Sequence, residues 1–456
     1  MTPRIETANP RYPYIPSSRI PPLLQLPRVP HITYRSEERS RSGSEDATVL
    51  GRDPKMRPSS VGIRKCFPKI NLGEFPRIAQ KIALSRGASF GFLTSKSNLW
   101  KLLPVTAMAT ATETQTAQSE PKFTFAAQFE AKDLVEFDPH RVYGDWRDEF
   151  HKTGCVLIKN VISKERAKYY ADKQIEWLKK FNLGFDEKNP ETWTAEHLPV
   201  NFKGGMYYMY GATHEKYVWE ARTEPAVVDI FEKLWDTNEL ICSFDGQNIS
   251  MPNRKDLSWS PWPHCDQNPE RKGMQAVQGL LNFAPNGPKD GGLMLMKGSS
   301  KLFDEFFAQK RESADHEDAP PPEIKYMDLF LFSKKDVKWF EDRGCELYKV
   351  NMEPGDFVLW DSRTMHYATL PEGDQIRHVQ YICMTPRKFA REEALEAKKY
   401  CFENWLGTTH WPHCNIRPSA EKPMRNGELC SAYRTEPFEK PELTDKVLQL
   451  AGVKGY

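Results

Sequence analysis

Residues 353–386 read EPGDFVLWDSRTMHYATLPEGDQIRHVQYICMTP and contain two apolar runs separated by turn residues. The tripeptide PGD at 354–356 is typical of a turn, and the apolar run at 357–360 that follows it predicts a strand. A second turn is indicated at 371–374, and another strand is expected to begin near Ile376. The stretch therefore predicts two antiparallel strands.

The same stretch carries two side chains that suit a binding site, His366 and Arg377. Two antiparallel strands joined by the predicted turn would place both side chains on the same wall of a barrel. Upstream, WPHCD at 262–266 supplies an imidazole and a carboxylate, on His264 and Asp266. Side chains at i and i+2 of a strand share a face, so we expect these two groups to converge.

Short apolar runs separated by Pro, Gly, Asn and Asp continue over 239–386. This spacing predicts an antiparallel sandwich or barrel. Helical patterns flank it, so the expected class is mainly β with flanking helices. The predicted helices span 163–181, 224–236, 388–407 and a segment near 441–451.

His264, Asp266 and His366 together predict a metal centre. Two His and one carboxylate on one face of an ion leave three positions open, a pattern typical of non-haem Fe(II) oxygenases. Two open positions suit a bidentate 2-oxo acid, and the third suits O2. The distal carboxylate of that acid suits a buried Arg, whose planar fork donates two charge-assisted hydrogen bonds. We therefore predict that the triad binds the metal and is catalytic, and that Arg377 binds the 2-oxo acid.

These residues and their spacing resemble those of the phytanoyl-CoA dioxygenase family of Fe(II)/2-oxoglutarate-dependent oxygenases, in particular a fungal branch. DGGLMLMKGSSK at 290–301 is similar to the family's Gly-Gly-Leu…Pro-Gly-Ser-His-Lys segment, with Lys297 in place of Pro and Ser300 in place of His. The resemblance covers roughly residues 145–386.

The resemblance implies a double-stranded β-helix core of the jelly-roll or cupin-like kind. It also implies Fe(2+), 2-oxoglutarate and O2, with ascorbate as a reductant. The implied reaction oxidises a C–H bond of a small organic or acyl substrate and releases succinate and CO2. Because halogenating relatives carry a small residue in place of the carboxylate, Asp266 favours hydroxylation, desaturation or ring chemistry over halogenation. Two alternatives stay open: a cupin-type metal enzyme that does not use 2-oxoglutarate, and a non-catalytic binding protein on the same fold.

Further side chains are candidates for the surroundings of the centre. Gln278, in the strand predicted at 277–283, is expected to contact the co-substrate or the substrate, and Asn282 shares its face. A structural hydrogen bond is the alternative for each amide. Lys203 and Arg222 are candidates for pairing with an anionic substrate.

The tetrapeptide WPHC occurs a second time, at 411–414, where Asn415 follows it. An amide cannot replace a carboxylate as an anionic ligand, so we expect this copy to be packing. A zinc site formed by His410, His413 and Cys414 is the alternative, although paired zinc-finger spacing is missing.

The 456 residues divide by composition into three parts. Residues 1–121 are basic and rich in Pro, Ser and Arg, and they are expected to be disordered. Within them, residues 1–107 carry 18 Lys/Arg against 7 Asp/Glu. Residues 122–410 are expected to form the oxygenase domain, with its core strands at 239–386. Residues 411–456 are expected to be an irregular C-terminal extension.

Composition also limits the partners and the compartment. The net charge of +2 gives no reason to expect nucleic acid, and no apolar run long enough for a membrane span occurs. Nine dispersed cysteines favour a reducing compartment. We expect a cytoplasmic protein that binds a small molecule, or a mitochondrial one if residues 56–107 act as a presequence. Translation could instead start at Met56 or Met108, and the oligomeric state is left open.

Overall fold

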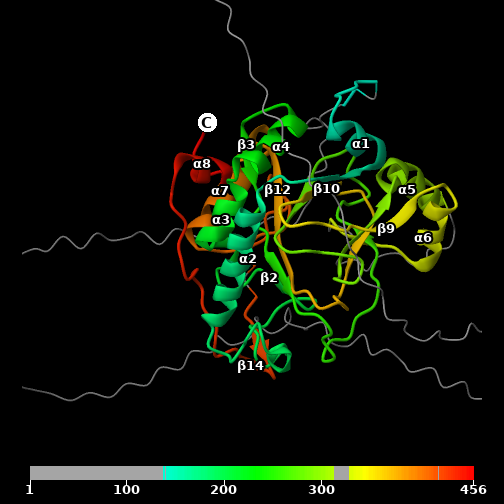
Figure 1. Ribbon diagram of the computed structural model, residues 1–456. Helices are drawn as coiled ribbons and strands as arrows, with labels where there is room; N and C mark the ends of the chain where they lie inside the picture. Colours follow the sequence, from blue (N-terminus) through cyan, green and yellow to red (C-terminus); the bar gives the residue numbers. More distant parts are fainter. Residues whose placement is uncertain (1–136, 139, 313–327, 420) are drawn as a thin grey trace, which may run out of the picture. The chain divides into compact units, whose positions relative to one another are not determined.

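The computed structural model describes residues 137–138, 140–312, 328–419 and 421–456 (Figure 1). The chain divides into two units, residues 1–108 and 109–456, and all described residues belong to the second. The basic segment 1–121, with the candidate presequence and the alternative starts, lies outside the described residues.

Two antiparallel sheets form the centre of the described unit, which confirms a mainly β fold with helices. The larger sheet has seven strands. Its order is β1 (Cys155–Ile158), β10 (Phe357–Asp361), β6 (Val277–Asn282), β12 (Arg377–Pro386), β4 (Gln247–Ser250) and β2 (Met206–Tyr207), with β3 (Leu240–Cys242) also beside β12. The smaller sheet has five strands in the order β8 (Phe330–Leu331), β5 (His264–Cys265), β11 (His366–Thr369), β7 (Gly292–Lys297) and β9 (Glu346–Lys349).

Helices cover both sheets from outside (Figure 1). The seven-stranded sheet packs against α2 (Lys164–Lys179), α3 (Lys216–Arg222), α4 (Pro225–Trp235), α7 (Glu392–Glu403) and α8 (Asp445–Leu450). The five-stranded sheet packs against α5 (Phe303–Glu312) and α6 (Lys334–Glu341). The remaining elements are α1 (Trp146–Thr153), four short 3-10 helices (Pro190–Thr192, Ala212–His214, Ser299–Leu302, Arg387–Phe389) and the hairpin β13 (Met424–Arg425) and β14 (Glu428–Leu429).

An apolar cluster fills the space between the two sheets. Leu280 and Val379 of the larger sheet meet Leu293 and Leu295 of the smaller one in this cluster. Each such side chain contributes about 1.5–3 kcal/mol when it is fully buried. Because strand side chains alternate, the neighbouring residue Leu281 faces the helices instead. Both faces of the larger sheet are therefore buried.

Local signals account for most of these elements. The hydroxyl of Ser163 accepts a hydrogen bond from the Arg166 N–H and caps α2, as the sequence predicts. The predicted helix at 224–236 is α4. No helix was predicted between 182 and 222, and α3 lies at the end of this segment. This helix has only seven residues, too few for its periodicity to stand out.

The prediction that His366 and Arg377 share one wall is wrong. His366 begins β11, which pairs with β5 and β7, whereas Arg377 begins β12, which pairs with β4 and β6. The turn at 371–374 therefore leads from one sheet to the other. Turn chemistry alone does not say whether the strands that it joins pair with each other, which explains the error.

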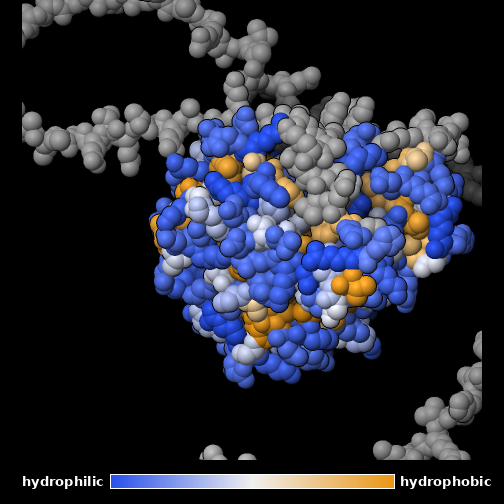
Figure 2. All heavy atoms as spheres, turned by 90° about the horizontal axis from the view of Figure 1, so that it is seen from above, coloured by the Kyte–Doolittle hydropathy of each residue, from blue (hydrophilic) through white to orange (hydrophobic). Residues whose placement is uncertain are grey.

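The face of the protein seen in Figure 2 is mainly hydrophilic, and its apolar side chains gather in separate patches. None of the helices in the described part of the chain has the length and apolar composition that a membrane span needs.

Candidate metal centre

Two neighbouring strands bring the predicted triad together. His264 of β5 and His366 of β11 are direct antiparallel partners. Asp266 lies just beyond the end of β5, where its backbone N–H donates to the Ser362 carbonyl at 2.9 Å. One ligand atom from each of the three side chains lies within 4.8 Å of the others. The convergence thus depends on strand pairing as well as on the His-x-Asp spacing.

Hydrogen bonds fix the orientation of both imidazoles. The Nδ1 atom of His264 lies 3.1 Å from the Trp262 carbonyl, and that of His366 lies 2.9 Å from the Thr364 carbonyl. Because a carbonyl only accepts, Nδ1 of each neutral ring carries the proton and donates it. The lone pair of each ring is therefore on Nε2, which lies 3.7 Å from Asp266 Oδ1 for His264 and 3.1 Å from Asp266 Oδ2 for His366.

The donor set suits a divalent cation. Burial, followed by the neighbouring His366, lowers the pKa of His264 to about 3, so this ring stays neutral. Burial by itself would raise the pKa of Asp266, but the imidazoles of His264, His410 and His366 outweigh it and hold the pKa well below its usual range. The Nε2 lone pairs of the two imidazoles and the Asp266 carboxylate repel each other, and a cation bound between them would remove this repulsion. Two nitrogens and one oxygen with open positions fit Fe(II).

Gln278 contacts the triad directly. Its Nε2 donates to Asp266 Oδ2 at 2.9 Å from strand β6, which belongs to the other sheet. The sequence predicted a contact to the co-substrate or the substrate, and the structure places this amide on the carboxylate. Asn282, on the same face of β6, donates to the backbone carbonyls of Ala284 and Glu353 instead. Gln278 is therefore placed to orient Asp266, whereas Asn282 has a structural hydrogen bond.

Arg377 is buried beside the start of β7, and the residue is only 4% exposed. A Cβ atom on Gly292 would lie 2.8 Å from the Arg377 Nε, so the glycine leaves room for the guanidinium. Gly292 also has a φ of +95°, which other residues rarely adopt. Within the described ranges, no hydrogen bond or ion pair joins this guanidinium to another residue.

Lys349 is a second, half-buried cation at this place, and sequence reasoning missed it. Its Nζ donates to Asn286 Oδ1 at 2.6 Å and to the Val350 carbonyl at 2.8 Å. Burial, and then the charge of Arg377, lower its pKa to about 8. An anion bound here would therefore be stabilised by two cations. A lysine at the end of a short alternating strand gave no signal of burial in the sequence.

A cavity of about 340 Å³ opens at the triad. Its apolar and aromatic lining includes Met206, Trp262, Leu293, Trp360 and Tyr381, and its polar lining includes Asp245, Asp328, Thr409, His410, Asn415 and Arg417. Arg377 lies next to Gly292, one residue beyond the lining residue Leu293. The cavity therefore connects the metal ligands with walls that come from distant parts of the chain.

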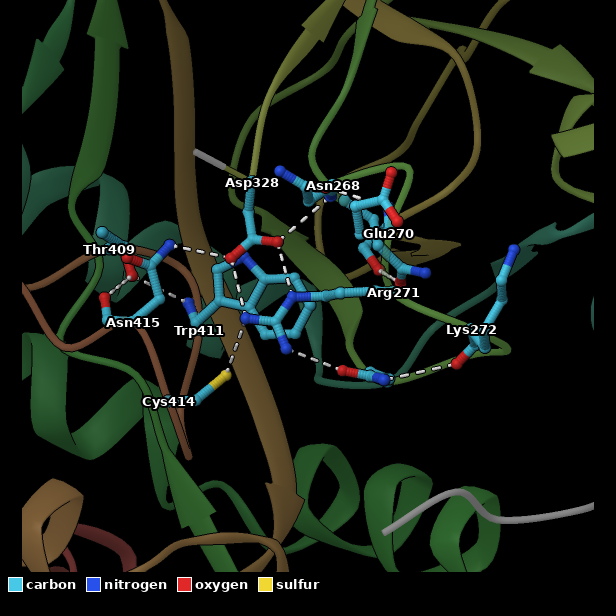
Figure 3. Close-up of polar contacts among 12 residues, drawn as sticks. Asn268, Glu270, Arg271, Lys272, Asp328, Thr409, Trp411, Cys414 and Asn415 are labelled. Carbon is cyan, nitrogen blue, oxygen red and sulfur yellow. Dashed lines mark hydrogen bonds and ion pairs between the residues drawn. The ribbon is translucent and has the colours of Figure 1, made fainter. Parts of the chain in front are cut away.

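The second WPHC motif packs through contacts with Arg271 and Asp328 (Figure 3), and the residues that flank it line the cavity. The Arg271 guanidinium lies over the Trp411 ring and donates to the Cys414 sulfur at 3.5 Å. Asn415 donates to Asp328 at 3.0 Å. These contacts agree with packing, but His410 and Asn415 line the cavity, which the sequence did not indicate.

The zinc alternative finds no support in the part of the chain that is described. Among the described residues, the triad is the one group of three His, Cys, Asp or Glu side chains whose ligand atoms converge. The Nδ1 atom of His413 instead lies 3.1 Å from the Thr385 hydroxyl oxygen.

The two candidate cations for an anionic substrate have different surroundings. Arg222 is fully buried, and its guanidinium donates to the carbonyls of Thr213 and Asp245. The ammonium group of Lys203 lies over the face of the Trp262 ring. That ring in turn stacks on His264, with centroids 4.0 Å apart and planes at 7°.

Comparison with known proteins shows the family of the chain. The model of the family "Phytanoyl-CoA dioxygenase (PhyH)" matches residues 150–379. The chain is 62% identical over 279 residues to Ava biosynthesis cluster protein O of Aspergillus versicolor, which covers 61% of this chain and 89% of that protein. It is 21% identical over 277 residues to a phytanoyl-CoA dioxygenase candidate of Dictyostelium discoideum, covering 52% of this chain and 74% of that protein.

Likeness to solved structures is weaker. The iron-bound structure of EctD from S. alaskensis has 13% identity and a TM-score of 0.38, covering 60% of this chain and 85% of that chain.

Proposed function

Because the chain belongs to the phytanoyl-CoA dioxygenase family, we propose that it oxidises a C–H bond of a small organic or acyl molecule, most simply by hydroxylation. The protein is an Fe(II)/2-oxoglutarate-dependent oxygenase. In the balanced reaction, R–H, O2 and 2-oxoglutarate give R–OH, succinate and CO2, with ascorbate keeping the iron reduced. The observation that carries the proposal is the convergence of the His264, Asp266 and His366 ligand atoms within 4.8 Å.

His264, Asp266 and His366 would hold the iron. When bound, the iron supplies the activation of O2 that the oxidation of a C–H bond requires. The two Nδ1–H···O=C hydrogen bonds keep both imidazoles in the ligand tautomer. Gln278 would hold the Asp266 carboxylate in its orientation through the 2.9 Å hydrogen bond.

Arg377 would bind the distal carboxylate of 2-oxoglutarate. It is a buried cation, and in the described structure no anion neutralises it. Gly292 leaves room for it, and Lys349 adds a second positive charge nearby. We also propose that the two facing sheets are the walls of a double-stranded β-helix, with the metal centre where β5, β11 and β6 approach one another.

The size of the cavity and the similarity to a biosynthesis cluster protein support a small-molecule substrate. An acyl substrate, of the kind that the family's name indicates, would also belong to this class of small molecules. The outcome of the reaction is proposed to be hydroxylation because Asp266 occupies the third ligand position.

The test is a succinate-release assay on the purified protein with Fe(II), 2-oxoglutarate, ascorbate and O2, with and without a panel of small molecules. We expect release of succinate that a substrate accelerates, and loss of this release in the Asp266→Ala variant with the fold retained by circular dichroism. Glu341→Gln, which changes an exposed residue of α6, is the control. Turnover that does not require 2-oxoglutarate would favour a cupin-type metal enzyme. Binding of a small molecule without any succinate would favour a binding protein.

A further inference from the structure

The cavity wall contains a carboxylate, that of Asp245, whose function the metal centre does not explain. Asp245 lies in the link between β3 and β4 and lines the cavity. One of its oxygens accepts a hydrogen bond from the Gly246 N–H at 2.6 Å. Asp245 is half-buried, and it faces the open cavity.

The other carboxylates of the lining are already engaged. Asp266 belongs to the triad, and Asp328 forms an ion pair with Arg271, with N–O distances of 2.6 Å and 3.0 Å. Arg222, the cation near Asp245, donates to its backbone carbonyl rather than to its carboxylate. Within the described residues, no ion pair is formed by the Asp245 side chain. A carboxylate in such a place gains stability from a ligand that donates hydrogen bonds to it.

His410 adds a second group with unused hydrogen-bonding capacity. It comes from the segment before the second WPHC motif, and its Nε2 is buried without a hydrogen-bond partner among the described residues. It lines the same cavity as Asp245 and Asp266. In its neutral form an imidazole can accept a hydrogen bond at Nε2.

We propose that Asp245 and His410 bind a basic nitrogen of the substrate, so that the substrate is a small, largely aromatic or apolar molecule that carries a protonated amine or a similar cation. The inference rests on the proposed function and adds the substrate class to it. A protonated nitrogen has several N–H donors, so it can donate to the carboxylate and to the imidazole together. Trp262, Trp360 and Tyr381 in the walls offer aromatic faces, which favour both a cation and an apolar ring.

The test measures binding rather than turnover, on the full chain loaded with Mn(II) and 2-oxoglutarate without O2. Three probes of similar shape are compared by calorimetry: 2-phenylethylamine, 2-phenylethanol and 3-phenylpropanoate. We expect the amine to bind at least about tenfold more tightly than the carboxylate, since one charge-assisted hydrogen bond is worth this factor. Equal affinities, or no binding of the amine at millimolar concentration, would overturn the inference.

Variants identify the residues responsible. Asp245→Asn keeps an oxygen for the Gly246 N–H and should abolish the preference for the amine, whereas Asp245→Glu should keep part of it. His410→Phe keeps an aromatic ring and should weaken binding of the amine about tenfold or more, because it removes one hydrogen bond from the protonated nitrogen. Glu341→Gln, with the same loss of one negative charge at the surface, should change nothing. An unchanged preference in Asp245→Asn would contradict the assignment.

Binding of Mn(II) and 2-oxoglutarate is measured first, so that the two proposals can fail separately. Wild-type protein that binds neither would contradict the proposed function. Wild-type protein that binds both but does not prefer the amine would contradict only the substrate class.

Discussion

At the scale of single residues, the same local device prepares both imidazoles for a metal. Each ring donates from Nδ1 to the carbonyl two residues before it, from His264 to Trp262 and from His366 to Thr364. A short-range contact thus decides the tautomer, and the tautomer leaves the lone pair of each ring on Nε2, the atom that could bind a metal. The strand pairing of His264 with His366 then brings these two atoms to Asp266.

Gln278 is expected to act through Asp266. The change Gln278→Leu removes the hydrogen bond to the Asp266 carboxylate while keeping a side chain of similar size. Loss of such a partner typically weakens metal affinity by about 10- to 100-fold. Titration of the apoprotein with Fe(II) without O2 would measure this, and Gln309→Leu, on the exposed face of α5, is the matched control. Equal Fe(II) affinity in both variants would show that Asp266 needs no orienting partner.

Arg377→Lys tests the second half of the site. Lysine keeps the charge but loses one of two charge-assisted hydrogen bonds, each worth about 1.5–3 kcal/mol, so the KM for 2-oxoglutarate should rise more than about tenfold. Because Lys349 also lies there, some affinity should remain. Succinate release as a function of 2-oxoglutarate concentration measures the effect, with the exposed Arg343→Lys as control. An unchanged KM would mean that Arg377 does not bind the co-substrate.

At the scale of elements, one buried ion pair holds three separate segments beside the cavity (Figure 3). Arg271 comes from the loop after β5, Asp328 precedes β8, and Cys414 and Asn415 belong to the second WPHC motif. Both charged side chains are almost fully buried, with exposures of 2% and 1%. The segment that carries His410 is thus held in place by a contact that lies outside the metal centre.

Removing one partner of this pair should be costly. Asp328→Asn leaves the Arg271 charge buried without its carboxylate, and breaking a buried pair in this way typically costs about 3–5 kcal/mol of unfolding free energy. The same change at Asp304, whose ion pair with Lys272 is more than half exposed, should cost less than about 1 kcal/mol. Urea unfolding of both variants makes the comparison. Equal stability of the two would show that the Arg271–Asp328 pair does not hold the segment.

Elements with strong local signals were predictable, and contacts between sheets were not. The cap Ser163 and the apolar run at 357–360 indicated α2 and β10 correctly, because capping and alternation act over a few residues. The triad followed from its residue types. The crossing from β11 to β12, however, depends on which strands pair, and the turn between them does not encode this.

The cavity wall was beyond sequence reasoning for the same reason. Asp245, His410 and Lys349 lie far from the triad in sequence and enter the site only through tertiary packing. Each is of a residue type that is common on surfaces, so its position in the site gave no local signal. The second WPHC motif was correctly expected to pack, but its place beside the cavity was set by the Arg271–Asp328 pair.

At the scale of the whole described unit, the C-terminal segment is joined to the helical layer through one buried carboxylate, that of Glu215. It accepts hydrogen bonds from the Trp177 indole N–H of α2 at 3.1 Å and from the backbone N–H groups of Phe438 and Glu439 at 2.6 Å and 3.0 Å. Glu215 is only 1% exposed. Three parts of the chain thus depend on the charge state of one side chain.

This dependence predicts a change of stability with pH. Burial raises the pKa of Glu215 from 4.5 to about 7, despite the opposing hydrogen bonds from Phe438 and Glu439. The folded protein therefore keeps a proton that the unfolded chain releases above pH 4.5. The associated stability is fully present below pH 4.5, declines as the pH rises, and is lost above the folded-state pKa of about 7. Over this interval it amounts to about 3 kcal/mol.

Glu215→Gln separates this effect from all other titrating groups, because glutamine keeps the shape of the side chain and does not titrate. The unfolding free energy of the wild type minus that of Glu215→Gln should fall by about 3 kcal/mol between pH 4.5 and pH 8. Urea unfolding at several pH values measures this difference, with the exposed Glu341→Gln as the control whose difference should stay constant. A constant difference for Glu215→Gln as well would mean that the carboxylate is ionised in the folded protein throughout, and that its three N–H donors outweigh burial.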